Sequence, residues 1–181
     1  VKDGIITEED SKNMCGSWSA LNDYGEATNL NLAHIKNCDC TNVKDLTLSE
    51  IESRKKAKIA IKALQHTLPG FKNIKLRNHA MTLGTRDSRK ILAHYNLCGK
   101  DVLGQARFND SIGIFPEFLD GYNILVIPSS GRYFQIPLRC LIPQNIEGLL
   151  VGGRCVGGDS ISHSAMRNMM ACTVTGQGAG V

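Results

Sequence analysis

The 181-residue sequence has no long hydrophobic run, few aromatic residues and no low-complexity linker. A transmembrane helix needs roughly 18 or more consecutive apolar residues, and no stretch of this chain approaches that length. Aromatic residues make up only 6% of the chain, and none is interleaved with the basic cluster at residues 54–56, which argues against a protein that binds single-stranded nucleic acid. We therefore expect a globular protein that binds neither membranes nor nucleic acids.

The sequence also lacks a visible signal peptide, because no positively charged start leads into an apolar segment. We expect a cytoplasmic protein. The chain begins at Val1 and not at Met, and processing can remove an N-terminal targeting signal. Seven cysteines is an odd number, so complete internal pairing is impossible, and this favours a reducing compartment. Cys38 and Cys40 lie near His34, but no C-x-x-C pair occurs anywhere to complete a zinc site. We expect no metal.

The formal net charge is +4, a mild excess of basic residues. A solvated surface explains such an excess, and so does an anionic cofactor or substrate. The charge alone does not choose between these two explanations.

Local patterns predict one long helix and several strands. Thr47 and Glu50 match a capping box that opens a helix with an apolar face, and Pro69-Gly70 ends it. Alternation of apolar and polar residues predicts strands at residues 90–97, 123–127 and 134–140. Pro137 confines the last of these to a sheet edge or a bulge. The polar residues 1–46 predict loops, with a short strand near residues 29–35.

The most informative stretch begins with the apolar run at residues 149–151, which predicts a strand buried in a parallel or mixed sheet. Gly152 and Gly153 follow, and their missing side chains permit a flat ligand or another backbone to approach closely. From His163 onward, apolar residues recur at spacings of three and four, which predicts a helix. Serines 160, 162 and 164 are its candidate N-caps, and the N–H groups of a first helical turn attract anions and polarised carbonyl oxygens.

These segments resemble a known family. The runs YFQIPLRCLIP, LLVGGRCV and SHSAMRNMMACTVTGQGAG are similar in order and spacing to the C-terminal region of the FAD-dependent oxidoreductases. Upstream, the T-x-x-E-I-E-x-R opening at Thr47, the Pro69-Gly70-Phe71 ending and the segment at residues 84–89 also match. The chain departs from the family at Leu138, which replaces a Tyr, and at Gly152 and Gly178, which each replace an Ala.

The resemblance implies a fold, a cofactor and site residues. It implies an α/β fold of mixed sheet and helices, namely the C-terminal part of a glutathione-reductase-like FAD-binding fold. Residues 1–131 would belong to a substrate or cap domain, and residues 132–181 would supply a strand and helix of the FAD-binding domain. The cofactor-binding residues would be Gly152, Gly153, Arg154, Ser164, Ala165, Met166 and Arg167. Arg86 and Arg139 would contact an anionic small-molecule substrate. The guanidiniums of Arg86 and Arg89 beside Asp87 fit an internal ion-pair network equally well.

A dinucleotide-binding βαβ unit with its G-x-G-x-x-G turn is absent from the 181 residues. The glycines at 176, 178 and 180 follow a helix and lack the required spacing. We therefore expect the C-terminal part of an FAD-dependent oxidoreductase, with another polypeptide segment supplying the missing half. The alternative is a non-catalytic binding or structural module derived from such a flavoprotein.

Overall fold

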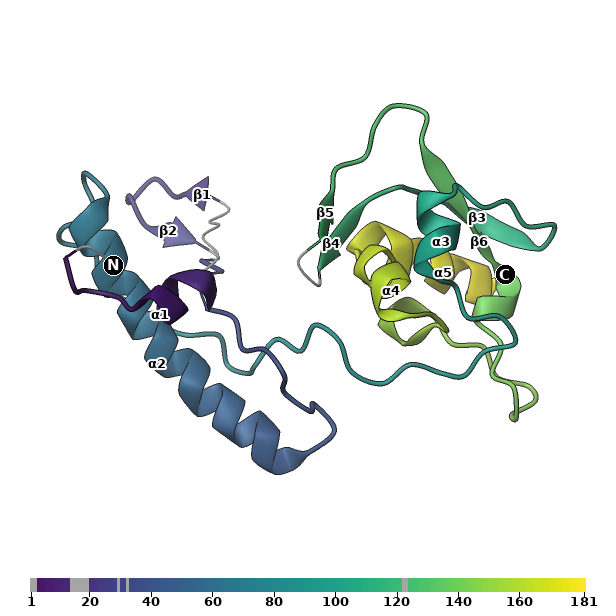
Figure 1. The fold of residues 1–181 in the computed structure, drawn as a ribbon, viewed down its shortest axis with the longest axis horizontal. Helices are drawn as coiled ribbons and strands as arrows, with labels where there is room; N and C mark the ends of the chain where they lie inside the picture. The colour runs from purple at the N-terminus through teal and green to yellow at the C-terminus, as the bar shows by residue number, and fades with distance from the viewer. Residues whose placement is uncertain (1–2, 14–19, 29, 32, 122–123) are drawn as a thin grey trace. The chain divides into compact units, whose positions relative to one another are not determined.

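The computed structural model describes residues 3–13, 20–28, 30–31, 33–121 and 124–181, and Figure 1 shows their secondary structure. The chain divides into two compact units, Val1–Thr85 and Arg86–Val181, which are described separately below. Helices and small antiparallel sheets make up both units, which fits the predicted mixed α/β class. Among the described residues, no helix combines the length and apolar character needed to cross a lipid bilayer.

The first unit is built around one long helix. Its elements are α1 (Glu8–Asn13), β1 (Ala20–Leu21), β2 (Ala27–Thr28) and α2 (Val43–Thr67), with β1 and β2 paired antiparallel. A small apolar cluster forms where Ala60 and Ile61 of α2 meet Leu30, Leu64 and Ile74. The predicted strand near residues 29–35 is not found: residues 29 and 32 lie outside the described residues, and the described ones form no strand.

Helix α2 begins earlier than predicted. Its N-cap is Asn42, whose side-chain oxygen accepts a hydrogen bond from the backbone N–H of Lys44 at 2.9 Å. The hydroxyl of Thr47 instead donates to the carbonyl of Val43 one turn back, as a Thr inside a helix does. The predicted capping box is therefore wrong, because an earlier residue with a strong N-cap preference starts the helix. The predicted end is confirmed, since Leu68 is the C-cap directly before Pro69.

The second unit carries a single larger core. Its elements are α3 (Gly99–Leu103), β3 (Ser111–Pro116), β4 (Leu119–Gly121), β5 (Ile124–Val126), β6 (Tyr133–Pro137), the 3-10 helices η1 (Leu138–Cys140) and η2 (Gly153–Cys155), α4 (Ser160–Met166) and α5 (Met169–Gly180). Strand β3 pairs with β6 and β4 with β5, each antiparallel. Phe115 and Phe134 lie side by side across the β3–β6 pair, with ring centroids 6.1 Å apart.

Two of the strands predicted in the second unit are wrong. Residues 149–151 form no strand, and Leu149 and Leu150 remain 44% and 43% exposed. A continuous apolar run becomes a buried strand only when neighbouring strands cover it, and none of the described strands does so. Residues 90–97 alternate in burial as expected, with Ala93 and Leu97 fully buried. They make only isolated bridges, to Pro143 and Gly158.

Two other predicted strands exist with different ends. Strand β5 (Ile124–Val126) lies within the predicted residues 123–127, and residue 123 is outside the described part of the chain. Strand β6 (Tyr133–Pro137) stops at Pro137, after which the chain turns into η1. It pairs only with β3 among the described strands, and a bulge interrupts their register between Ser111 and Gly113. Pro137 therefore ends an edge strand, as expected for a residue without a backbone N–H.

The predicted helix from His163 is in fact two helices. Helix α4 is capped by Asp159, whose carboxylate accepts from the N–H of Ser162 at 2.7 Å, in place of the serines predicted for this role. It stops at Met166, and α5 begins at Met169. The break falls at Asn168, whose side-chain amide donates to the carbonyls of Ser164 and Ala165 at the end of α4. Those bonds satisfy carbonyls that a continuing helix would have used.

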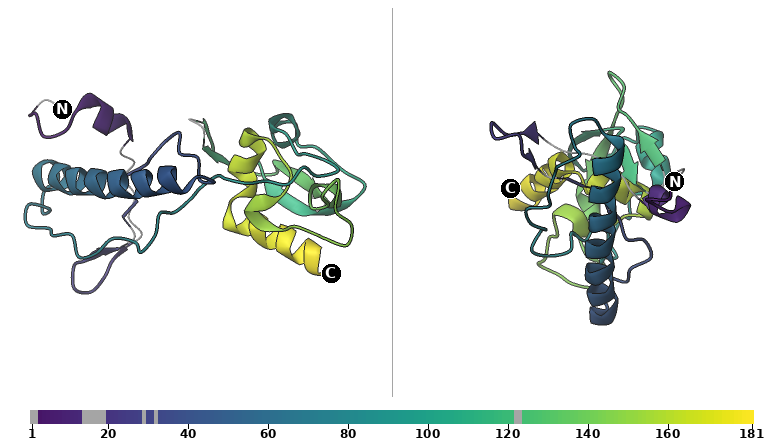
Figure 2. Two further views of the ribbon diagram at one scale, coloured as in Figure 1. Left: turned by 90° about the horizontal axis from the view of Figure 1, so that it is seen from below. Right: turned by 90° about the vertical axis from the view of Figure 1, so that its left-hand side faces the viewer.

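Helix α5 packs directly on β3, while α4 packs on β4, as Figures 1 and 2 show. The contact between α5 and β3 depends on a missing Cβ on each side. A Cβ added at Gly113 of β3 would lie 2.5 Å from Val174 of α5, and one added at Gly178 of α5 would lie 2.6 Å from Ile112 of β3. Each element thus receives a β-branched side chain of the other where it has only a hydrogen.

The predicted domain boundary between residues 131 and 132 lies inside this second unit. Strands β3 and β6 pair across it. It stays a prediction about how a complete FAD-binding fold divides.

The α5–β3 contact predicts opposite effects for two glycines on one helix. Replacing an interior helical Gly by Ala stabilises a helix by about 1 kcal/mol, and Gly176 has open space around its Cβ position. Gly176→Ala should therefore raise the free energy of unfolding. Gly178→Ala should lower it by roughly 1 kcal/mol, because the new methyl would meet the Cβ of Ile112 at 2.9 Å and overpack the contact. Urea unfolding monitored by circular dichroism measures both, and stabilisation by both variants would contradict the described packing.

Candidate functional site

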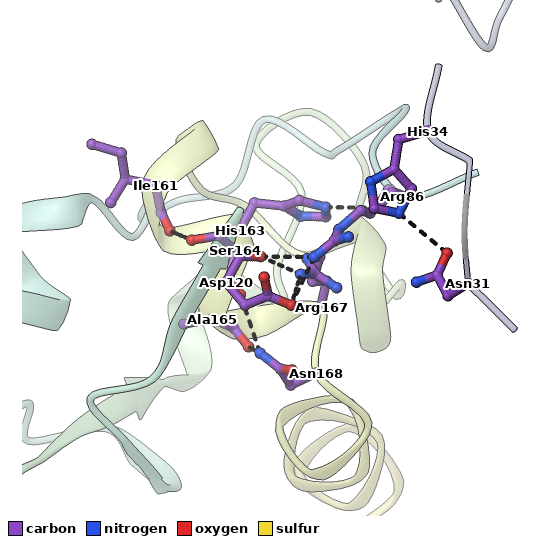
Figure 3. Close-up of polar contacts among 10 residues, drawn as sticks. All are labelled: Asn31, His34, Arg86, Asp120, Ile161, His163, Ser164, Ala165, Arg167 and Asn168. Atoms are coloured by element: carbon purple, nitrogen blue, oxygen red, sulfur yellow. Dashed lines mark hydrogen bonds and ion pairs between the residues drawn. The ribbon is translucent and has the colours of Figure 1, made fainter. Parts of the chain in front are cut away.

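A cluster of charged side chains lies where α4 meets β4 (Figure 3). Oxygen Oδ2 of Asp120, on β4, accepts from Nη2 of Arg86 at 2.7 Å and from Nη2 of Arg167 at 2.9 Å. Both guanidiniums also donate to the backbone carbonyl of Asp120. The side chains of Arg86 and Asp120 are 43% and 46% exposed, whereas that of Arg167 is 15% exposed. One carboxylate thus ties the start of the second unit to the end of α4.

His163 is the buried member of this cluster. Its side chain is 2% exposed, and Nε2 lies 3.2 Å from the backbone carbonyl of Arg86 and 3.4 Å from Oδ1 of Asp87. A carbonyl can only accept, so Nε2 carries the proton in this contact. Burial lowers the pKa of His163; Lys90 and Arg167 lower it further, and the contacts with Arg86 and Asp87 oppose the change. His163 is therefore neutral at neutral pH, and Lys90 pairs with Asp87 at 2.9 Å.

A second group of residues lies at the loop before α4. Gly153 opens η2 with a φ of +76°, a conformation that few residues other than Gly adopt. Its N–H donates to the hydroxyl of the fully buried Thr175 on α5 at 2.9 Å. A Cβ added at Gly152 would lie 3.3 Å from the backbone of Gly176. The glycine loop is thus held against α5, and Arg154 is exposed beside it.

The N-terminus of α5 is open. Its N-cap, Asn168, makes no side-chain bond to α5, because its amide is used on the carbonyls of α4. The first N–H groups of a helix have no partner within the helix, and together they act as roughly half a positive charge. Met169 and Met170 in this first turn are 87% and 71% exposed. An acceptor oxygen or an anion can therefore reach this end of α5.

Apart from Arg139, the predicted site residues divide into three groups. Gly152, Gly153 and Arg154 are exposed or half-buried and lie beside α5. Ser164, Ala165 and Met166 are at most 1% exposed inside the second unit, so their side chains present almost no surface to a ligand. Arg167 and Arg86 meet at Asp120.

Arg139, the other predicted substrate contact, lies in a different ion pair. Its Nε and Nη2 atoms donate to the two carboxylate oxygens of Asp110 at 2.9 and 3.2 Å. Its guanidinium lies 5.3 Å from the ring centroid of Tyr95. The hydrogen bonds from Arg139 are the main reason that the pKa of Asp110 is lowered. Arg139 therefore joins η1 to the turn before β3.

Sequence reasoning missed four residues that organise these groups, namely Asp120, Asp159, Asn168 and Thr175. Each acts through a contact that is set by the fold. The only local signal was the preference of Asp and Asn for N-cap positions, at Asp159 and Asn168. Among the described residues, no group of three or more His, Cys, Asp or Glu side chains could hold a metal ion.

Comparison with known proteins decides the family. A family model of FAD dependent oxidoreductases matches residues 6–181, nearly the whole chain. The chain belongs to the FAD-dependent oxidoreductase family. No curated protein and no solved structure matches it.

The residues present fit one part of FAD, the cofactor implied by this family. The glycine loop at residues 152–153 has no side chains, and a Cβ at Gly153 would meet open space, so a flat ring can approach it. The open N-terminus of α5 suits the electron-rich edge of such a ring. The pyrophosphate needs a glycine-rich turn of its own, and the 181 residues contain no G-x-G-x-x-G.

Burial of His163 predicts a pH-dependent stability that one substitution removes. A neutral buried His contributes stability that is fully present above about pH 6.5 and is lost as the pH falls through its lowered folded-state pKa. In His163→Gln, whose amide can still donate to the Arg86 carbonyl, the free energy of unfolding should fall less between about pH 7.5 and pH 5. The difference is at most about 1.4 kcal/mol per pH unit. Urea unfolding over this range measures it, and parallel curves for both proteins would contradict the buried neutral His.

The shared carboxylate predicts a second stability effect. Asp120→Asn leaves Arg86 and Arg167 close together without their common counter-ion, so the free energy of unfolding should fall by about 1 kcal/mol. The matched control is Glu147→Gln, because Glu147 is exposed in the same unit and forms no ion pair within the described residues. It should change stability by less than about 0.5 kcal/mol. Equal effects of the two substitutions, measured by thermal unfolding, would show that Asp120 holds nothing together.

Proposed function

We propose that this chain supplies the flavin-facing and substrate-facing part of an FAD-dependent oxidoreductase with a glutathione-reductase-like fold. The observation that carries the proposal is the glycine loop at residues 152–153 held by Thr175 beside α5, whose N-terminus is open. When bound, the flavin supplies the redox chemistry. Gly153 would leave room for the ring, Gly152 would keep the loop against α5, and Arg154 would hold the edge of the ring. The first turn of α5 stabilises negative charge on a ring oxygen by about 0.3–1 kcal/mol.

The buried residues of α4 have an indirect role in this proposal. Ser164, Ala165 and Met166 pack α4 into the core, and Arg167 and Asn168 then lead into α5. The resemblance to the family implied that residues 164–167 bind the cofactor. Because the helix breaks before Met169, we assign that role to the turn that begins at this residue.

We assign the substrate side to the exposed arginines of the second unit. Arg86 is 43% exposed and Arg139 is 49% exposed. Each is already paired with a carboxylate, Asp120 or Asp110. An anionic substrate would therefore compete with that carboxylate for the guanidinium, which favours substrates that offer two acceptor oxygens to one arginine.

We assign the pyrophosphate-binding βαβ unit to a polypeptide segment outside these 181 residues. The exposed apolar side chains at Leu149, Leu150 and Ile146 support this assignment, because such side chains gain stability when a neighbouring surface covers them. Within such a fold, residues 1–131 belong to the cap and residues 132–181 to the FAD-binding domain. Residues 149–151 then gain the strand partners that they lack among the described elements.

The second candidate function is a non-catalytic binding or structural module derived from a flavoprotein. One observation favours it: Arg86, Arg139 and Arg167 are all engaged in internal ion pairs. Arginines that hold a fold together need no ligand. A flavin titration separates the two candidates.

Ring binding by this chain alone is the test. We expect saturable quenching of flavin fluorescence when the purified chain is titrated into FAD or into riboflavin. The two affinities should be similar, because these residues include no pyrophosphate-binding turn. Gly153→Ala should weaken binding about tenfold, or about 1.4 kcal/mol, because the new methyl occupies the open space beside the glycine loop.

The matched control is Gly131→Ala. Gly131 has a similar φ of +80° and equally open surroundings in the connection between β5 and β6, so it carries the same backbone strain away from α5. It should leave flavin binding unchanged. If neither flavin is quenched by a chain whose circular dichroism shows it to be folded, the binding or structural module is the better reading.

A further inference from the structure

Two thiols lie side by side in the first unit, in a segment that the flavin site does not use. Cys40 Sγ is 3.9 Å from Cys38 Sγ and 3.7 Å from the backbone carbonyl of Cys38, and its single S–H proton can be donated to either acceptor. Both side chains are half-buried, so a small molecule can reach them. Cys40 therefore faces Cys38 Sγ, which is the approach that a resolving thiol makes to a mixed disulfide. The geometry fits Cys38 as the attacking thiol and Cys40 as the resolving thiol.

The backbone that carries the two thiols is held in a defined turn. The carboxylate of Asp39 accepts from the N–H and the hydroxyl of Thr41 at 2.9 and 2.7 Å. The carbonyl of Asp39 accepts from the N–H of Asn42 at 3.0 Å, and Asn42 is the N-cap of α2. These bonds fix the turn between the cysteines to the start of a 25-residue helix. The short distance between the sulfurs is thus supported by the local fold.

We propose that Cys38 and Cys40 form a redox-active dithiol that exchanges with small disulfides. The Cys38 thiolate attacks one sulfur of a small disulfide, the disulfide bond breaks, and a mixed disulfide and one small thiol result. The Cys40 thiolate then attacks Cys38 Sγ and releases the second small thiol. Two protein thiols become one intramolecular disulfide, the small disulfide is reduced to two thiols, and these two thiols take up the two protons.

A disulfide between Cys38 and Cys40 would be a labile one. A disulfide stabilises a protein mainly by closing a loop in the unfolded chain, and the benefit grows with loop length. A bond across a single intervening residue closes almost no loop, so little folding stability resists its reduction. The pair is therefore suited to reversible redox chemistry and poorly suited to a structural role.

The test uses glutathione buffers that range from reducing to oxidising. After acid quenching and alkylation, trypsin cleavage at Lys36 and Lys44 releases both cysteines in one peptide of residues 37–44. We expect this peptide to pass from the doubly alkylated form in reducing buffers to an unalkylated disulfide form in oxidising buffers. The disulfide form is two hydrogens lighter than the unalkylated dithiol peptide. The exposed Cys155 serves as the internal control, and Cys155→Ser should leave the transition unchanged.

Single substitutions test the order of attack. In Cys40→Ser the glutathione mixed disulfide on Cys38 cannot be resolved, so it should accumulate to at least about ten times its level in the wild type. In Cys38→Ser the mixed disulfide on Cys40 should form more slowly. The proposal fails if the peptide stays doubly alkylated in every buffer or if the wild type stops at the mixed disulfide. It also fails if the peptide becomes joined to a different cysteine of the chain.

Discussion

The close approach of α5 to β3 determines where the candidate site lies. Val174 occupies the space above Gly113, and Ile112 occupies the space above Gly178, so the helix and strand fit only where both glycines face a branched side chain. This contact fixes the rotation of α5 about its own axis. It thereby aims Thr175 at the loop, where its hydroxyl accepts the N–H of Gly153. A stability contact on one face of α5 thus positions the glycine loop on another.

The break between α4 and α5 has a comparable role. A single helix through residues 160–180 would have one N-terminus, at Asp159, and the carboxylate of Asp159 caps it. The side-chain amide of Asn168 instead donates hydrogen bonds to the carbonyls at the end of α4. The new helix end that this creates keeps its N–H groups available, since no side-chain cap from Asn168 satisfies them. The interruption creates a second positive helix terminus, at Met169, on the same helix whose Thr175 holds the glycine loop.

How much of this the sequence could predict depends on the range of the interaction. The end of α2 was predictable because Pro69 excludes the helical conformation at the residue before it. The glycine loop was predictable because Gly152 and Gly153 have no side chains, which is also a local property. The start of α2 was not, because Asn42 and Thr47 both have N-cap preferences and the chain uses the earlier one. The strand predicted at residues 149–151 is wrong because a buried strand requires neighbouring strands that cover it, and a local pattern does not reveal whether they exist.

The candidate site was only partly predictable for the same reason. Arg86 and Arg167 were identified from the family motif, but their common partner, Asp120, lies 34 and 47 positions away along the chain. No spacing rule links positions so far apart. The resemblance to the family supplied the site residues, and the structure supplied the contacts that decide which of them a ligand can reach.

The protonation state of His163 sets the charge that a ligand would meet at this cluster. Arg86, Lys90 and Arg167 bring three positive charges, and Asp87 and Asp120 balance two of them. Burial keeps His163 neutral at neutral pH by lowering its pKa, so the cluster retains a single positive charge. A protonated His163 would double that charge, but its side chain is 2% exposed and lies near Lys90 and Arg167, so desolvation and repulsion outweigh the attraction of Asp87. The positive charge offered to a substrate therefore rests on the exposed Arg86, and its strength depends on how firmly Asp120 competes for it.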